Sequence, residues 1–516
     1  MAKNWNIQDS AQLYHLLQWG GEYFNINELG HLSVHPYRSQ EPSIDLMDVI
    51  QDIQEKNLHF PCVIRFQDIL HDRVKHLNEC FKKTIKSYNY KGQYCGVYPI
   101  KVNQLREVVE EILDAGSKYH FGLEAGSKGE LLTVLALNHD LKALTICNGY
   151  KDEEYLRLAL MGRKLGRKVM IVIEKISELP LLLRVAEEMK VEPMIGLRAK
   201  LSSRGSGRWQ NSGGDLAKFG LTVPEIMQAV AILKKHRKKR WLKLFHFHVG
   251  SQITDIRFIK ESVREGARLY AKLYQMGFKL EYFDVGGGLG VDYDGSRSSN
   301  QSSMNYSLEE YVEDIVYNVQ QICQEERVPE PHIVSESGRA LVAHHSCLII
   351  PVFGSIAIED KSHQNQSSKS SKESVVKDLE YLFKDLKTEN ALSIFHDAQT
   401  KKIEALDKFK LGILSLEDRA HAENLYWKIC QKILELLPKI EHLPEDLIEL
   451  KTKMSHQYLA NFSLFQSAPD HWAFDQLFPI VPVHRLKEKP EEDSTIVDIT
   501  CDSDGKINRF IDSEDS

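Results

Sequence analysis

The chain has 516 residues, of which 42% are hydrophobic and 27% are charged, and this is the composition of an ordinary globular protein. Its 66 basic and 73 acidic residues give a net charge of −7, which argues against a nucleic-acid-binding or membrane-surface protein. The length predicts roughly two to four domains, and no apolar stretch is long enough to predict a transmembrane helix.

Cysteine usage and the first residues predict a cytoplasmic protein. Eight cysteines are scattered without a CxxC pair, so neither a zinc site nor a disulfide framework is expected. The opening MAKNWNIQDSAQLYHLL has no apolar core of the signal-peptide type. The basic run KKHRKKR at 234–240 follows an apolar helical pattern, and we expect it at the end of that helix, where cations suit the helix dipole.

The elements, taken in chain order, predict a barrel. Residues 1–42 hold short extended pieces, and residues 43–360 alternate short apolar runs with amphipathic helices, which predicts a parallel sheet. The candidate strands are FPCVIRF, VYPIKV, YHFGLE, LTICNG, KVMIVIE, MIGLRA, LFHFHV, YFDVGG and HIVSES. Because their number is close to that of a (β/α)₈ barrel and no GxGxxG turn follows the first, a closed barrel is favoured over an open dinucleotide-binding sheet.

The pattern changes after the barrel. The polar stretch at 361–374, KSHQNQSSKSSKES, predicts a flexible linker. Residues 375–457 are charged and helical in period, which predicts a helical insert. Strand-like pieces return at 458–516, and we expect them to form one β domain together with residues 1–42.

Polar groups gather where the candidate strands end. Barrel enzymes carry their active sites at this edge, and here it holds Lys101, Glu124, Arg198, His248, Ser251, Glu336 and Arg339. A single lysine after an apolar run is also explained by an amine that extends to water. The run VGGGLG offers bare backbone N–H groups to an anion, although glycines equally mark a plain turn.

The combination of lysine, glycine loop and carboxylate indicates a pyridoxal phosphate site. A lysine forms a Schiff base with the aldehyde of this cofactor. The loop Gly286, Gly287 and Gly288 would hold the phosphate. Glu336 would pair with the pyridine nitrogen and keep it protonated, so that the ring accepts electrons.

The segment HFHVGSQ leaves a second interpretation open. His246 and His248 are two residues apart and share one face of their strand, and metal-dependent hydrolases also begin a metal site with HxH at a strand end. The nearest candidates for further ligands are His332, His344 and His345. None of them lies at a clean strand end, so the ligand set is not completed. In the cofactor interpretation, one histidine stacks on the pyridine ring and the other is structural.

Nine ordered motifs together resemble the biosynthetic arginine decarboxylases, pyridoxal-phosphate enzymes of alanine-racemase-like fold. They are YPIKVNQ, GLEAGSKGEL, ICNGYKD, GLRAKL, HFHVGSQ, DVGGGLGVDY, SESGRA, NFSLFQSAPDHW and TCDSDG. The resemblance implies a PLP-binding (β/α)₈ TIM-like barrel, a β domain from both terminal segments and a helical insert. It also implies decarboxylation of L-arginine to agmatine and CO₂ in polyamine biosynthesis, toward putrescine and spermidine.

The resemblance assigns roles residue by residue. Lys101 matches the Schiff-base lysine, His248 the ring that stacks on the cofactor, and Glu336 the partner of the pyridine nitrogen. Further cofactor contacts are implied at Glu124, Arg198, Ser251, Gly286, Gly287, Gly288 and Arg339. Cys501 and Asp502 match a pair that enters the neighbouring subunit's site, where the cysteine returns a proton to the carbanion and the aspartate meets the substrate's cationic end. Other substrate contacts are implied at Asp470, Asp284, Leu289 and Tyr293.

Shared sites imply a homo-oligomer, either a dimer or a tetramer. Magnesium is also common in the family, although the sequence shows no ligand signature for it. Family chains continue past TCDSDG with a stretch that carries a Gly-Ala-Tyr motif, whereas this sequence stops at Ser516. Two alternatives therefore stay open: a catalytically impaired, shortened homologue, and a related decarboxylase that acts on ornithine or diaminopimelate.

Overall fold

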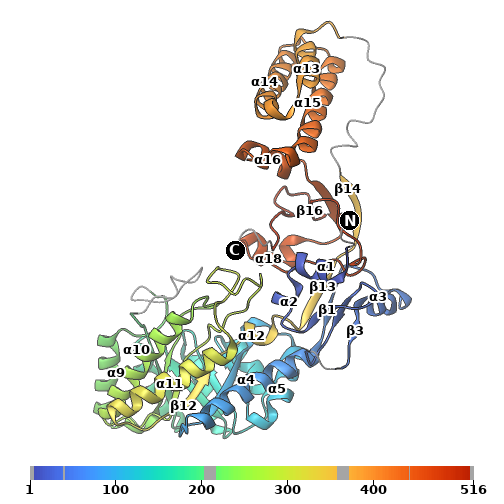
Figure 1. Ribbon diagram of the computed structural model, residues 1–516. Helices are drawn as coiled ribbons and strands as arrows, with labels where there is room; N and C mark the ends of the chain where they lie inside the picture. The colour runs from blue at the N-terminus through green and yellow to red at the C-terminus, as the bar shows by residue number, and fades with distance from the viewer. Residues whose placement is uncertain (1–4, 39–40, 203–216, 357–370, 441, 512–516) are drawn as a thin grey trace.

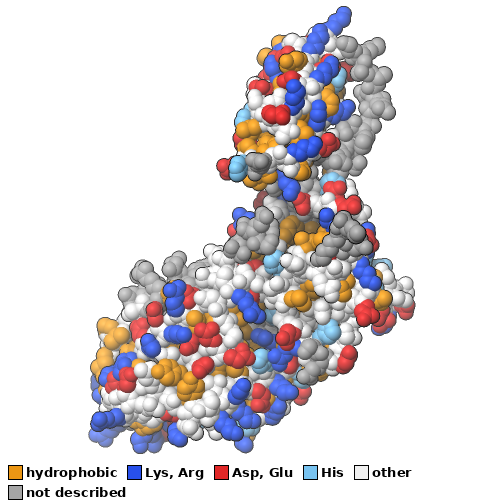
Figure 2. Space-filling model, in the orientation of Figure 1, with side chains coloured by type: hydrophobic (Ala, Val, Ile, Leu, Met, Phe, Trp, Pro, Cys, Tyr) orange, Lys and Arg blue, Asp and Glu red, His pale blue; other side chains and the backbone are white. Residues whose placement is uncertain are grey.

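The structure is a computed structural model that describes residues 5–38, 41–202, 217–356, 371–440 and 442–511 (Figure 1). Residues 361–370, most of the expected linker, lie outside the described residues. No helix in these ranges combines the length and the apolar character that crossing a bilayer requires. Figure 2 shows acidic and basic side chains interspersed over the visible face of the barrel.

Eight parallel strands close into a barrel, which confirms the predicted (β/α)₈ fold. In spatial order they are β10 (Leu242–Phe247), β11 (Tyr282–Asp284), β12 (His332–Ser335), β5 (Tyr94–Pro99), β6 (Gly122–Ala125), β7 (Leu144–Cys147), β8 (Lys168–Ile173) and β9 (Met194–Ala199). Their side chains are mostly buried, because one face fills the barrel and the other packs under helices.

Most of the helices around the barrel are amphipathic, and several of them start at polar caps. The barrel helices are α4 (Gln67–Ser87), α5 (Arg106–Gly116), α6 (Lys128–Leu137), α7 (Glu153–Lys164), α8 (Glu178–Met189), α9 (Val223–Lys235), α10 (Ile256–Gln275) and α11 (Leu308–Glu326). At the start of α11, for example, the Ser307 side chain accepts the backbone N–H of Glu310. Lys234 and Lys235 occupy the last turn of α9, as expected for the basic run.

One candidate strand lies outside the barrel. The segment FPCVIRF forms β4 (Cys62–Arg65), which pairs antiparallel with β13 (Ser346–Ile349). Val63 in this strand is 49% exposed, whereas the barrel strands are almost wholly buried. The prediction that this strand belongs to the barrel series is wrong, because an apolar run alone does not distinguish an outer, half-covered strand from a barrel strand.

The two terminal segments meet, as expected, but they form two separate sheets. The first consists of β1 (Phe24–Ile26), β2 (Leu32–Val34) and β3 (Ile44–Asp45), and the second of β14 (Val352–Ile356), β15 (His456–Ala460), β16 (Ser494–Val497) and β17 (Lys506–Ile507). Backbone hydrogen bonds join the two ends of the chain: Leu32 N–H donates to the Val483 carbonyl at 2.8 Å, and Leu486 N–H donates to the Gly30 carbonyl at 3.0 Å. Smaller helices here are α1 (Ile7–Leu13), α2 (Leu16–Trp19), α3 (Leu46–Glu55), α17 (Leu464–Ser467) and α18 (Pro469–Phe474).

The helical insert is a separate bundle between two paired strands. It contains α13 (Ser374–Asp385), α14 (Ala391–Lys410), α15 (Leu416–Leu436) and α16 (Glu445–Lys453), which stand apart from the barrel in Figure 1. The bundle has its own core, in which Val375, Leu379 and Ile429 are fully buried. The flanking strands β14 and β15 pair antiparallel, with Ile356 opposite Gln457.

Candidate active site

Lys101 lies at the barrel mouth beside a buried carboxyl group. It occupies the single turn Ile100–Val102, directly after β5, and its side chain is 55% exposed. Its Nζ lies 3.6 Å from Oε2 of Glu124, a fully buried residue of the neighbouring strand β6. Burial lowers the pKa of the Lys101 amine, but the charges of Glu124 and Glu336 outweigh it and raise the pKa overall. The amine is therefore accessible and held by buried carboxylates.

Glu336 follows β12 directly and points into the same region. Asn148, at the end of β7, donates a hydrogen bond from Nδ2 to Oε1 of Glu336 at 2.7 Å. Burial raises the pKa of both Glu124 and Glu336 to about 7, and neighbouring carboxylates add to the rise while Lys101 opposes it. The carboxyl groups are thus poised to change protonation near neutral pH.

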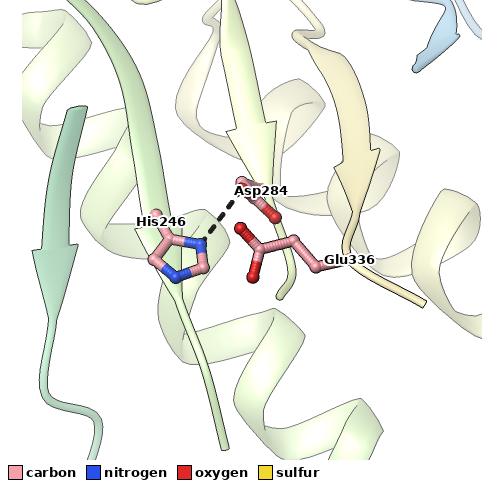
Figure 3. A group of neighbouring side chains, drawn as sticks. All are labelled: His246, Asp284 and Glu336. Atoms are coloured by element: carbon pink, nitrogen blue, oxygen red, sulfur yellow. Dashed lines mark ion pairs between the residues drawn. The ribbon is translucent and has the colours of Figure 1, made fainter. Parts of the chain in front are cut away.

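Glu336 also belongs to a buried cluster with His246 and Asp284 (Figure 3). Nδ1 of His246 lies 3.2 Å from Oδ2 of Asp284, and one donor atom from each of the three residues lies within 4.8 Å of the others. Within the described ranges, this is the group whose atoms are close enough to hold one metal ion. The same two carboxyl groups could instead face a protonated ring nitrogen, and the geometry alone leaves both uses open.

His248 is held as a neutral ring above the glycine loop. Its Nδ1 accepts the backbone N–H of Gly287 at 3.0 Å, so this nitrogen carries no proton. Burial lowers the pKa of His248 well below its ordinary value, and the charges of Arg198 and Lys101 lower it further. Gly286 has φ +69°, and a Cβ there would lie only 2.4 Å from the carbonyl oxygen of Phe247. The loop must therefore be glycine to pass so close to β10.

Two arginines complete the mouth. Both Oε atoms of the buried Glu174 accept from Nη1 of Arg198 at 3.1 Å, which fixes that guanidinium on β9. Arg339 starts α12 (Arg339–Val342), with its guanidinium carbon 6.0 Å from the ring centre of Tyr293. Its Nε is buried and has no hydrogen-bond acceptor among the described residues. A buried cationic N–H without an acceptor, together with a bare glycine loop, fits an anionic group such as a phosphate.

The other predicted site residues fall in three places. Ser251 is half-buried after β10, and Leu289 is buried in the glycine loop. Asp284 is fully buried inside the barrel rather than at its mouth. Burial raises the pKa of Tyr293, and the charge of the exposed Asp470 on α18 raises it further, so these two side chains are neighbours.

Cys501 and Asp502 are not joined to the barrel site within one chain. They lie in the exposed turn between β16 and β17. No hydrogen bond or ion pair among the described residues links either side chain to Lys101 or Glu336. Their predicted roles depend on a second subunit.

Sequence reasoning missed several buried partners. Asn148 and Lys151 both lie in the motif ICNGYKD, but no role was predicted for either. The Lys151 side chain is fully buried, donates to the carbonyls of Gly149 and Val172, and lies 3.9 Å from the Glu178 carboxyl. The available signal was their position just after a strand, where polar residues face the mouth.

Comparison with known protein families identifies the cofactor of the barrel. Residues 74–343 match the family described as "Pyridoxal-dependent decarboxylase, pyridoxal binding domain", and residues 369–451 match the "Arginine decarboxylase helical bundle domain". The biosynthetic arginine decarboxylase of Gloeobacter violaceus is 47% identical over 513 residues, which cover 99% of this chain and 79% of that protein. The chain belongs to the biosynthetic arginine decarboxylase family.

Other relatives agree with this membership. The biosynthetic arginine decarboxylase of Bacteroides thetaiotaomicron is 46% identical over 510 residues, 99% of this chain and 81% of that protein. The crystal structure of the Campylobacter jejuni biosynthetic arginine decarboxylase matches with a TM-score of 0.83 at 34% identity, over 96% of this chain and 79% of that one. Diaminopimelate decarboxylase from Helicobacter pylori, complexed with L-lysine, has a TM-score of 0.56 at 16% identity over 88% of this chain and 83% of that one, and it shares the fold alone. As a member of the biosynthetic arginine decarboxylase family, the chain uses pyridoxal phosphate, and its barrel is the pyridoxal-binding domain.

Proposed function

We propose that this chain decarboxylates L-arginine to agmatine and CO₂ and so feeds polyamine biosynthesis. One observation carries the proposal: an accessible lysine amine and a buried carboxyl group meet at the mouth of a pyridoxal-binding barrel, in a chain that aligns almost completely with arginine decarboxylases. The alternative substrates ornithine and diaminopimelate lack comparable support, because the relatives that align over nearly the whole chain are arginine decarboxylases and the diaminopimelate decarboxylases share the fold alone.

The cofactor site we propose uses side chains from several barrel strands. Pyridoxal phosphate supplies an electron sink for the pair of electrons that remains when CO₂ leaves the substrate. Lys101 would bind its aldehyde carbon, His248 would cover the ring face, and Glu336 would pair with the ring nitrogen. The remaining contacts would come from Glu124, Arg198, Ser251, Gly286, Gly287, Gly288 and Arg339. The cluster of Figure 3 is thereby assigned to the ring and not to a metal ion, and magnesium has no place in the proposal.

The substrate site we propose is completed by a second copy of the chain. Decarboxylation consumes one proton at the α-carbon, and Cys501 of the neighbouring subunit would supply it. Asp502 and Asp470 would face the guanidinium, since two exposed carboxylates suit a planar cation. Leu289 and Tyr293 would line the substrate side of the glycine loop. The homo-oligomer, a dimer or a tetramer, belongs to this proposal.

Domain limits and location are also proposed. The division places a β segment at 1–42, the barrel at 43–360, a linker at 361–374, the helical insert at 375–457 and the second β segment at 458–516. A cytoplasmic location agrees with eight free cysteines, several of them buried and unpaired.

The decisive experiment removes the amine of Lys101. Lys101→Ala should lower CO₂ release from arginine by at least about a thousandfold, because the group that attaches the cofactor is lost. Borohydride reduction should trap pyridoxal phosphate covalently on the wild type but not on this variant. Lys243→Ala is the matched control, because Lys243 stands at the opposite, amino end of β10 and should keep both properties.

The same assay tests the substrate. Carbon dioxide release is measured with arginine, ornithine, lysine and diaminopimelate at equal concentrations. The proposal expects arginine to be preferred. It would be abandoned if ornithine or diaminopimelate were turned over and arginine were not, or if Lys101→Ala kept a trappable cofactor and full turnover.

A further inference from the structure

Three adjacent strands bring two acids and a histidine together inside the barrel. His246 on β10 and Asp284 on β11 are paired positions of the parallel ladder, and Glu336 follows β12, the next strand. The exposed fractions of His246, Asp284 and Glu336 are 0%, 0% and 4%. In Figure 3 the two carboxyl groups point toward each other, with the imidazole beside them.

Each carboxyl group has one oxygen satisfied from outside the cluster. Oδ1 of Asp284 accepts the backbone N–H of Gly286 at 2.8 Å, and Oε1 of Glu336 accepts from Asn148 at 2.7 Å. Oδ2 of Asp284 has no donor among the described residues and faces His246 and Glu336. Two buried carboxylates this close cannot both stay ionised at low cost, so the pair favours holding a proton.

Among the described residues, the two cations that act on the pair are each held by another acid. The titratable and charged groups that surround the pair are Lys101, Glu124, Glu130, Glu174, Arg198, His246, Tyr94 and Tyr311. Nζ of Lys101 lies 3.6 Å from Oε2 of Glu124, and Nη1 of Arg198 lies 3.1 Å from Oε1 of Glu174.

The remaining groups supply no positive charge. Burial lowers the pKa of His246, which keeps its ring neutral, and burial raises the pKa of both Asp284 and Glu336 to about 7. The counter-ion balance and the burial therefore agree that the two acids are not both ionised at neutral pH.

We infer that Asp284 is a positioning residue that shares one proton with Glu336 while the cofactor site is empty, and that the pair gives up this proton when the protonated ring nitrogen binds beside Glu336. This rests on the proposed function, in which Glu336 meets that nitrogen. Pyridoxal phosphate in neutral water already carries a proton on its ring nitrogen, so on binding an O–H bond of the acid pair breaks and its proton passes to solvent, and two carboxylates then face one cationic ring. Asp284 therefore acts through Glu336 and does not contact the substrate.

The proton count on cofactor binding tests the inference. Calorimetric titration of the cofactor-free protein with pyridoxal phosphate, in two buffers of different ionisation enthalpy near pH 7, gives the protons released per site. Asp284→Asn should release about one proton fewer than the wild type, because removing the second acid lowers the pKa of Glu336 and leaves it ionised beforehand. Asp72→Asn is the matched control: Asp72 is also buried, but it binds Tyr23 and Arg38 outside the barrel, and its variant should match the wild type.

Two measurements decide the inference if Asp284→Asn binds no cofactor, and the second, made on the wild type alone, decides it if this variant does not fold. In the cofactor-free wild type, the folded pKa of the pair lies above the unfolded values, so the folded state binds more protons and stability falls as pH rises from about 4 to about 7. In Asp284→Asn this slope should be smaller by about one proton. Infrared difference spectra of the wild type, with isotope-labelled aspartate and glutamate, should show a protonated carboxyl band that disappears when pyridoxal phosphate binds.

The outcomes separate the two proposals. An equal proton count in the wild type and Asp284→Asn, or no protonated carboxyl band in the wild type, would overturn the shared proton while leaving the decarboxylase assignment intact. Failure of the wild type to bind pyridoxal phosphate would overturn the proposed function instead. The pH slope of the cofactor-free protein would then still judge the acid pair.

Discussion

At the residue scale, Glu336 is the group whose charge we expect to matter most for the rate. Glu336→Gln should still bind pyridoxal phosphate, because the other proposed contacts remain, but turnover should fall by on the order of 100-fold, as when one electrostatic partner of a developing charge is removed. A neutral amide no longer favours a protonated ring nitrogen. Cofactor binding by absorbance and CO₂ release per bound cofactor give the two quantities separately.

Glu336→Asp is the control for this prediction, because it keeps the negative charge on a shorter side chain. It should retain more turnover than Glu336→Gln despite its poorer reach. Weaker cofactor binding with unchanged turnover per bound cofactor in Glu336→Gln would make Glu336 a structural residue only.

Some residues of the candidate site could be predicted from the sequence, and others could not. Lys101, Glu124 and Glu336 were predicted at one edge because the carboxyl ends of parallel strands converge there. The depth of Asp284 was not predictable, because it depends on β10, β11 and β12 being neighbours in a closed barrel and on their register. Asn148 was missed because a side chain in a turn gives no periodic signal, although its bond to Glu336 crosses the barrel.

At the element scale, the helical bundle is an insertion that the β domain should tolerate losing. Strands β14 and β15 pair antiparallel on either side of it, and Ile356 stands opposite Gln457. Replacing residues 357–455 with a turn of about four residues should therefore close a β-hairpin. We expect pyridoxal phosphate affinity within about twofold of the intact chain, because each core packs independently.

The control for this deletion adds Tyr458→Pro, which removes a ladder donor in the middle of β15 and should prevent the hairpin. Cofactor titration and thermal unfolding of both variants provide the comparison. Loss of cofactor binding in the simple deletion would mean that the bundle supports the barrel site directly.

Elements were predicted well where pattern and burial agree, and poorly where they diverge. The strand-helix alternation predicted the barrel because all its strands are covered on both faces and so read as continuous apolar runs. Strand β4 has a similar composition, yet it pairs with β13 outside the barrel. Only the pairing partner, which lies more than 280 residues away in the chain, distinguishes the two cases.

At the scale of the whole molecule, the proposed site needs parts from two copies of the chain. Lys101 lies at a barrel mouth, whereas Cys501 and Asp502 lie in an exposed turn of the second sheet, unconnected to that mouth among the described contacts of one chain. An exposed thiol is suited to reach into a neighbour's site, because it is not covered by the part of its own chain that the structure describes. We therefore expect activity only in a dimer or a larger assembly.

Mixing two inactive variants tests this arrangement. Lys101→Ala and Cys501→Ala, dissociated and reassembled together, should recover about one quarter of wild-type activity if a twofold dimer forms, because half of the dimers are mixed and each has one complete site. Mixing Lys101→Ala with the double variant Lys101→Ala/Cys501→Ala should recover none, since no site then has its lysine. Size measurement and CO₂ release on the same fractions locate the activity. An active monomer, or mixed dimers without recovered activity, would refute the shared site, because a complete site would then either lie within one chain or not use Cys501 at all.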